Sequence, residues 1–245
     1  MYMPLSRRII LLVRSRVKAL TLTVLAIGII QLPNLVSGDP TLLAEGFRDI
    51  FLFLCLVLPL IFASGGVSAD FRSGMARLWL QKPIDPVRFY LSRFSEGFLV
   101  SLVCALLALG ATRLGTAALG QPDETSQLLG YLAYVLTVAC VVFGFSSWIA
   151  RGSTLVVIGF LGASAAARGM GVTDLLGRPW NWLFDAILVP IPAVRGFRDF
   201  VVGTSDAFWI PSAQILAYGI GWTALGALGV WYTVNKGRLP HAEQS

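Results

Sequence analysis

Side chains able to do chemistry are scarce in this chain. It has one histidine, His241, near the end of the sequence, and three cysteines that each lie inside an apolar run. A serine–histidine dyad, a histidine-ligated haem and a histidine-based zinc site each need a histidine among their other residues. The cysteines have no metal-ligand spacing and are typical of small buried apolar residues: Cys55, Cys104 and Cys140. No G-x-x-x-x-G-K-[ST] loop is present, so we expect neither catalytic residues nor ATP hydrolysis by this chain itself.

One carboxylate lies just inside an apolar run, and it has two interpretations. Ionisable groups within a membrane are costly and often functional, so Glu96 is a candidate proton or cation site. It also lies one helical turn after Arg93, which would make it an interfacial residue paired at i, i+3. The second interpretation is the simpler one, and the sequence leaves both open.

The segment with the most distinctive pattern is basic and punctuated by prolines. Residues 69–93 read ADFRSGMARLWLQKPIDPVRFYLSR and lie between two apolar runs. The part 70–81 predicts a short amphipathic helix, which Lys82-Pro83 ends. Asp85 as N-cap and Pro86 at the first position then start a new helix. If that helix continues to residue 112 it is about 40 Å long, so it would protrude before it crosses a membrane.

The composition shows what must position these residues. Of the chain's residues 56% are hydrophobic and 13% charged, and the mean hydropathy is +0.75. A soluble domain has about 25% charged residues, so an integral membrane protein is the natural class. The net charge of +6 is better explained by anionic lipid headgroups and membrane topology than by nucleic acid, which we do not expect as a partner.

We therefore predict an all-α, polytopic membrane protein with six transmembrane helices. A spanning helix needs about 20 mostly apolar residues. The candidates form one transmembrane domain over 1–245, and the fifth is the shortest: 19–36, 49–68, 94–112, 128–149, 153–168 and 211–234.

The segment before the first span, residues 1–18, is basic on one side. Arg7, Arg14 and Lys18 share a helical face, and apolar residues lie largely opposite, as in a helix lying in the membrane interface. Arg16 falls on the apolar face and interrupts it. A plain topology signal, in which the cations hold this end in the cytosol, fits equally well.

The distribution of Lys and Arg predicts the orientation. With the N-terminus inside, most cations fall on the inner side, and the outer side keeps Arg48, Arg113, Arg168, Arg178, Arg195 and Arg198. This bias predicts that both termini are cytosolic, in a bacterial inner membrane. The loop 169–210 would be an outer amphiphilic segment of short helices, and 235–245 a polar cytosolic tail.

The central segment resembles a known family. Asp70-Phe-Arg-Ser-Gly74, Leu78-Trp-Leu-Gln-Lys82-Pro83-Ile84 and Arg88-Phe-Tyr-Leu-Ser-Arg93 resemble the element between spans two and three of ABC-2-type transporter permeases. Six spans, cytosolic termini and a long loop before the last span also fit that family. This chain departs from the family at two places. The family often has Glu at the start of the element, where this chain has Ala69-Asp70, and Ser-Arg after the proline, where this chain has Asp85-Pro86. These differences leave open which acid would contact a partner.

The resemblance implies a function and a set of contacts. The chain would be the membrane-spanning subunit of an ABC-type exporter, paired with a second copy or a related permease, surrounded by lipid and driven by a separate ATPase that binds the ATP. The segment 69–93 would act as a cytosolic coupling helix. Its contact residues would be Asp70, Phe71, Arg72, Gly74, Arg77, Lys82, Pro83 and Arg88.

Two other classes of function compete with this one. A non-transporting scaffold or assembly factor would lack an ATPase encoded nearby. An intramembrane enzyme acting on lipids would need several polar groups converging at one depth, for example around Glu96. The transported substrate and its direction are not encoded in any pattern that we recognise.

Overall fold

The computed structural model describes residues 5–36, 38–63, 67–73, 75–76, 85–121, 125–149, 152–169, 191–206 and 208–235, and the regular elements in these ranges are helices. The all-α prediction is therefore confirmed for this part of the chain. The helices are α1 (Leu5–Ile30), α2 (Leu32–Val36), α3 (Pro40–Phe62), α4 (Val67–Arg72), α6 (Pro86–Ala118), α7 (Thr125–Trp148), α8 (Ser153–Gly169), α11 (Ile191–Val202) and α12 (Trp209–Asn235).

Four of the described helices are long and apolar enough to cross a membrane. These are α3, which the apolar pattern extends into α4, and α6, α7 and α12. The prediction of a membrane protein is supported, whereas only four of the six predicted spans reach that length and hydropathy. In α1 the cations Arg14, Arg16 and Lys18 precede a short apolar stretch that Gln31 ends, and in α8 the apolar part covers only Ser153–Ala163.

Two long helices begin with the same capping arrangement. The Asp85 carboxylate accepts from the Val87 amide at 2.9 Å, and Pro86 occupies the first turn, which confirms the N-cap predicted there. Asp39 and Pro40 start α3 in the same way. The hydroxyl and amide of Thr41 donate to Asp39 and lower the pKa of that exposed carboxyl. These caps fix where helices α3 and α6 begin.

The core of the bundle lies between α3, α6 and α7. Phe51, Cys55 and Leu58 of α3 pack with Val100 of α6 and Val135 of α7. Cys55 and Cys140 are buried free thiols and Cys104 is half-buried, in agreement with their predicted role as apolar packing residues.

Helix α12 packs closely along α7 because glycines face aromatic rings across the contact. A Cβ at Gly226 would lie 2.4 Å from the Phe143 ring, and one at Gly144 would lie 2.5 Å from Trp222. Neither position has room for a larger residue unless a ring moves. Small residues thus bring these two helices together, as is common in membrane bundles.

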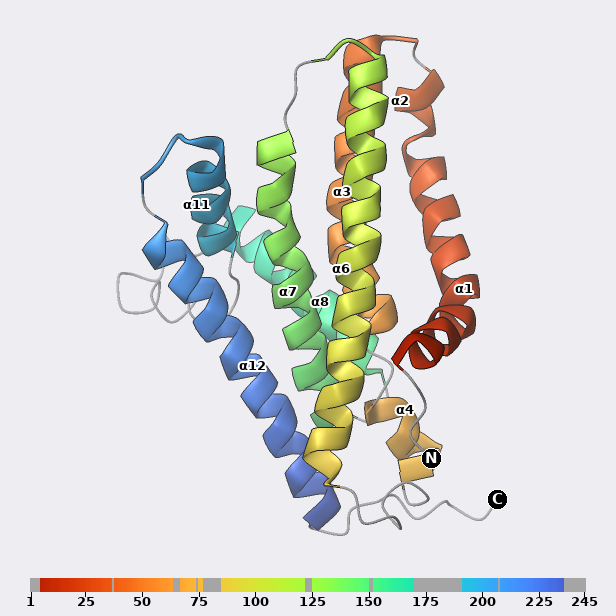
Figure 1. Ribbon diagram of the computed structural model, residues 1–245, viewed down its shortest axis with the longest axis vertical. Coiled ribbons are helices and arrows are strands. Elements are labelled where there is room, and N and C mark those ends of the chain that lie inside the picture. The colour runs from red at the N-terminus through yellow and green to blue at the C-terminus, as the bar shows by residue number, and fades with distance from the viewer. Residues whose placement is uncertain are drawn as a thin grey trace.

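Figure 1 shows how the helices are arranged. Helices α1 and α6 run in one direction, and α3, α7 and α12 run in the opposite direction. Helix α4, the start of α6 and the end of α12 lie at the same end of the molecule, which we call the base. Helix α2 and the end of α6 lie at the other end.

Several sequence predictions fall wholly or partly outside the described residues. The described part of the predicted interfacial segment 1–18 continues into the predicted first span 19–36 without a break, since α1 runs from Leu5 to Ile30. Of the loop 169–210, one short helix, α11, is described, and it packs on α7 and α12. Residues 170–190 and 236–245 lie outside the described part.

Candidate functional site

An ion pair at the base joins α4 to α6. The Arg93 guanidinium of α6 donates to the Asp70 carboxylate of α4, 23 residues earlier in the chain. The Tyr90 hydroxyl, one turn before Arg93, lies 3.5 Å from the same carboxylate oxygen. The Asp70 side chain is only 13% exposed, and that of Arg93 is 33% exposed. Both charges are therefore largely removed from solvent and depend on each other.

Aromatic side chains surround this ion pair. Phe71 is 3% exposed, and its ring centroid lies 5.8 Å from that of Tyr90. Phe89 packs edge-on against Tyr90 at 5.1 Å, and the Arg93 guanidinium lies 5.7 Å from the centre of the Phe89 ring. We call Asp70, Phe71, Phe89, Tyr90 and Arg93 the α4–α6 cluster.

The cluster fixes the position of α4 strongly for so short a helix. Removing one partner of a buried ion pair costs about 3–5 kcal/mol, and the partial exposure of Arg93 reduces this to about 2 kcal/mol here. Burial of Phe71 adds a contribution of similar size. Six residues of isolated helix would not be stable in water, so tertiary contacts hold α4 in place.

The outer side of the same base is charged and accessible. Arg88, in the first turn of α6, has a side chain that is 88% exposed. Its guanidinium lies 3.5 Å from Asp85, which is half-exposed, so the two form a weak surface pair. Arg88 is thus available to another protein, whereas Arg93 is committed to Asp70.

The structure divides the predicted contact residues into three groups. Asp70 and Phe71 face the protein's own α6, and Arg88 faces outward. Arg72 belongs to α4, but its side chain is outside the described part. The remaining four lie in segments that the structure does not describe: Gly74, Arg77, Lys82 and Pro83.

Glu96 lies on α6, about three turns after the helix starts at Pro86. Its carboxylate accepts a hydrogen bond from the Ser92 hydroxyl of the same helix at 3.5 Å. The predicted i, i+3 neighbour, Arg93, points instead to Asp70. Among the described residues no group of three histidine, cysteine, aspartate or glutamate side chains could hold a metal ion at Glu96 or elsewhere.

Sequence reasoning placed Tyr90 and Arg93 at the start of the third span but missed their link to Asp70. The available signal was their i, i+3 spacing, which puts a hydroxyl and a guanidinium on one face of α6. Their partner could not be identified, because Asp70 lies 23 residues before Arg93 on a different helix.

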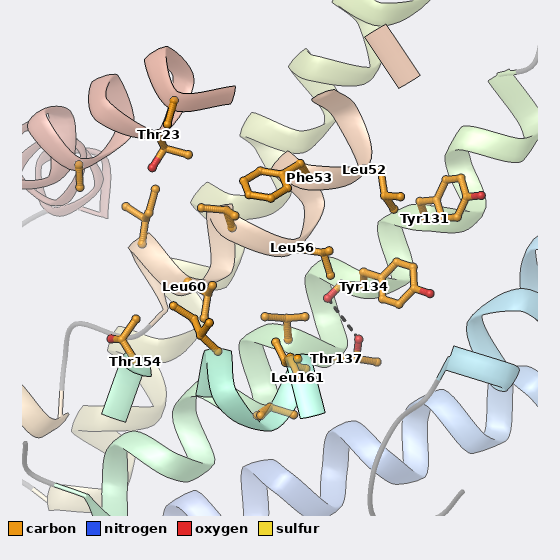
Figure 2. A pocket seen from close by; sticks show the side chains of 18 of the residues that line it. Thr23, Leu52, Phe53, Leu56, Leu60, Tyr131, Tyr134, Thr137, Thr154 and Leu161 are labelled. Atoms are coloured by element: carbon orange, nitrogen blue, oxygen red, sulfur yellow. Dashed lines mark hydrogen bonds between the residues drawn. The ribbon is translucent and has the colours of Figure 1, made fainter. Parts of the chain in front are cut away.

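A second feature, not foreseen at all, is a large cavity on the side of the bundle. It has a volume of about 970 Å³ and lies between α1, α3, α7 and α8. Figure 2 shows apolar side chains of α3, such as Leu52, Phe53 and Leu56, along one wall, with Tyr131 and Tyr134 of α7 near them and Thr23 of α1 across from them. Its size is at the upper end of the range for small-molecule sites, about 300–1,000 Å³.

Two arginines contribute to the cavity wall. The positive charge of Arg198, on α11, is balanced by a neighbouring carboxylate. Its guanidinium lies 2.7 Å from Asp199 and 3.3 Å from the Tyr131 hydroxyl. These bonds raise the pKa of Arg198 above its usual value. Arg16 of α1 has no ion-pair partner within the described ranges.

Comparison with protein families, with curated proteins and with solved structures finds no match for this chain. The resemblance of residues 69–93 to ABC-2-type permeases therefore stays a prediction. The function proposed below is therefore argued from the geometry of the base and of the cavity.

Proposed function

We propose that this chain is the membrane-spanning subunit of an ABC-type exporter, working as a dimer and driven by a separate ATPase. The observation that supports this most is the α4–α6 cluster. A short helix at the end of the bundle, between two spans, is tied to the next long helix by a shielded ion pair and packed rings. That is the construction needed to pass a push from outside the membrane into a span.

The mechanism follows from how α4 is held. A force on α4 reaches α6 through Asp70–Arg93 and through the contact of Phe71 with Tyr90. Helix α6 is 33 residues long, about 50 Å. A small tilt about its base therefore displaces its far end further than the base itself. Rigid-body motion of packed helices is an established way to convert a local push into a change of access.

The partner ATPase would meet the outward side of the base. Arg88 is the described residue best placed for this, and Arg72, Arg77 and Lys82 are expected beside it from the sequence. Basic side chains on a surface favour an acidic partner and mainly speed its association. Asp70 and Phe71 then have a different role from the one first predicted: they transmit the force and do not touch the ATPase.

Co-purification tests this proposal. The chain is expressed with any ATPase subunit encoded by a neighbouring gene, and the amount of ATPase that elutes with it is measured. Reversing charge with R88E, or with R72E and R77E together, should lower ATPase recovery several-fold while membrane insertion stays unchanged.

A matched control is R113E, on the same helix but near its far end. It should leave ATPase recovery unchanged, because that end is predicted to lie across the membrane. Equal loss of ATPase in R88E and R113E, or no loss in any variant, would contradict the proposal. Absence of any ATPase gene nearby would favour the scaffold alternative.

A further inference from the structure

Arg16 is the starting point, because its position contradicts the amphipathic pattern of its own helix. The cations Arg14 and Lys18 are exposed, on the face that residue spacing predicts for them. Arg16 lies on the opposite, apolar face, where a guanidinium is costly unless something pairs with it. The structure turns this face toward the cavity, and Arg16 forms part of the cavity wall.

The α1 wall of the cavity continues from Arg16 with small side chains. The lining positions are Arg16, Ala19, Thr23, Ala26 and Ile30, at the i, i+3, i+4 spacing of one helical face. From the first to the last of these the axis rises about 21 Å. This exceeds the depth of one leaflet, about 15 Å of the roughly 30 Å apolar thickness. The small residues leave the space open along this length.

The facing walls are mostly apolar. Leu52, Leu56 and Leu60 of α3 and Val138 of α7 line the space, together with Ile158 of α8. An unbranched apolar chain matches such a surface better than water does, because it removes the apolar side chains from solvent. The hydroxyl of Thr137 does not serve a ligand, because it already donates to backbone carbonyls of its own helix at 3.1 and 3.2 Å.

The two arginines of the wall are not equivalent. Arg198 has its charge matched by Asp199. Arg16 keeps an unmatched charge among the described residues and precedes the apolar stretch of α1. A planar guanidinium is suited to bind phosphate through two parallel hydrogen bonds.

We infer that this cavity is a binding site for a lipid with an anionic phosphate headgroup, whose phosphate pairs with Arg16 and whose acyl chain lies along Ala19, Thr23 and Ala26. The site goes beyond the proposed transport function and does not depend on the ATPase. It also explains why a cation interrupts the apolar face of α1.

Photo-crosslinking tests the inference. The whole protein is reconstituted in phosphatidylcholine bilayers that contain phosphatidylglycerol with a diazirine in its acyl chain. After irradiation, labelled peptides are identified by mass spectrometry, and unlabelled phosphatidylglycerol is titrated as competitor. We expect labels on α1 between Ala19 and Ile30 and on the facing part of α3.

Matched variants separate the site from general surface charge. R16Q should weaken competition about tenfold, whereas R14Q, which removes the same charge from the exposed face, should weaken it less than about threefold. A26W should abolish labelling by filling the cavity. If A26W does not elute as a folded species, A26L should reduce labelling in a graded way.

Several results would overturn the inference. Equal effects of R14Q and R16Q would show only surface attraction. Equal labelling by a diazirine phosphatidylcholine would remove the role of the anionic headgroup. If soluble glycerol phosphate displaces the diazirine lipid at the same concentration as unlabelled phosphatidylglycerol does, the acyl chain contributes nothing to binding. No cavity labelling, together with a change of oligomeric state in A26W, would show that a second copy of the chain fills this space.

Discussion

The base of the molecule and its side cavity both contain arginines and aromatic rings. In the base these groups contact one another, whereas in the cavity they border open space. In the α4–α6 cluster a cation, an acid and aromatic rings close on each other, and Phe71 is 3% exposed. In the cavity a cation stands beside small and aliphatic residues that leave about 970 Å³ open, and Phe53 on its wall is 44% exposed. A region that satisfies its own charges is built to hold a shape. The cavity leaves Arg16 without an ion-pair partner among the described residues, which is why we infer a ligand there.

The same substitution made in both regions should show the largest difference. F71A removes a ring packed against Tyr90 and should lower the free energy of unfolding by about 3 kcal/mol. F53A removes a half-exposed ring from the cavity wall and should cost below about 1 kcal/mol. Unfolding of the purified proteins in detergent measures both. Equal costs would mean that the base is not better packed than the cavity.

The next effect concerns the ion pair of the base. D70N leaves the Arg93 guanidinium largely shielded without its acid and should lower the free energy of unfolding by about 2 kcal/mol. The double variant D70N/R93Q should cost less than the sum of the two single variants, because the pair is lost only once. Strict additivity of the two changes would show that the two side chains do not interact.

The smallest effect comes from adding volume. Ala76 is fully buried in the same core cluster as Phe71 and Tyr90, so A76L should cost about 1–2 kcal/mol through overpacking. Ala26 borders the cavity, where A26L meets open space and should change the free energy of unfolding by less than about 0.5 kcal/mol. A large cost for A26L would mean that the cavity collapses in solution.

The features predicted correctly from the sequence are those that depend on residues close together in the chain. The helical class, the N-cap at Asp85 and the apolar role of Cys55 follow from local patterns, and the structure confirms them. The four longest apolar helices were also found, because run length is a direct signal. The family resemblance and the predicted ATPase contact are not decided by these observations.

What could not be predicted depends on contacts between distant segments. The pairing of Asp70 with Arg93, 23 residues later on α6, was not predicted, because no local pattern links the two positions. Arg16 was noted only as an interruption of an apolar face, since the cavity exists only once the helices around it are in place. Among the described residues four of the six predicted spans reach the length and hydropathy of a spanning helix, because cations reduce the apolar part of α1 and the apolar part of α8 is short.

The central claim is that α4 and α6 move as one rigid unit. Pulsed electron paramagnetic resonance tests it directly, with spin labels at S73C beside α4 and L107C on α6, both exposed sites, in a variant without the native cysteines. The account predicts one narrow distance distribution that stays unchanged when the ATPase and ATP are added, and that broadens in D70N. A broad distribution in the parent protein that D70N does not alter would contradict it.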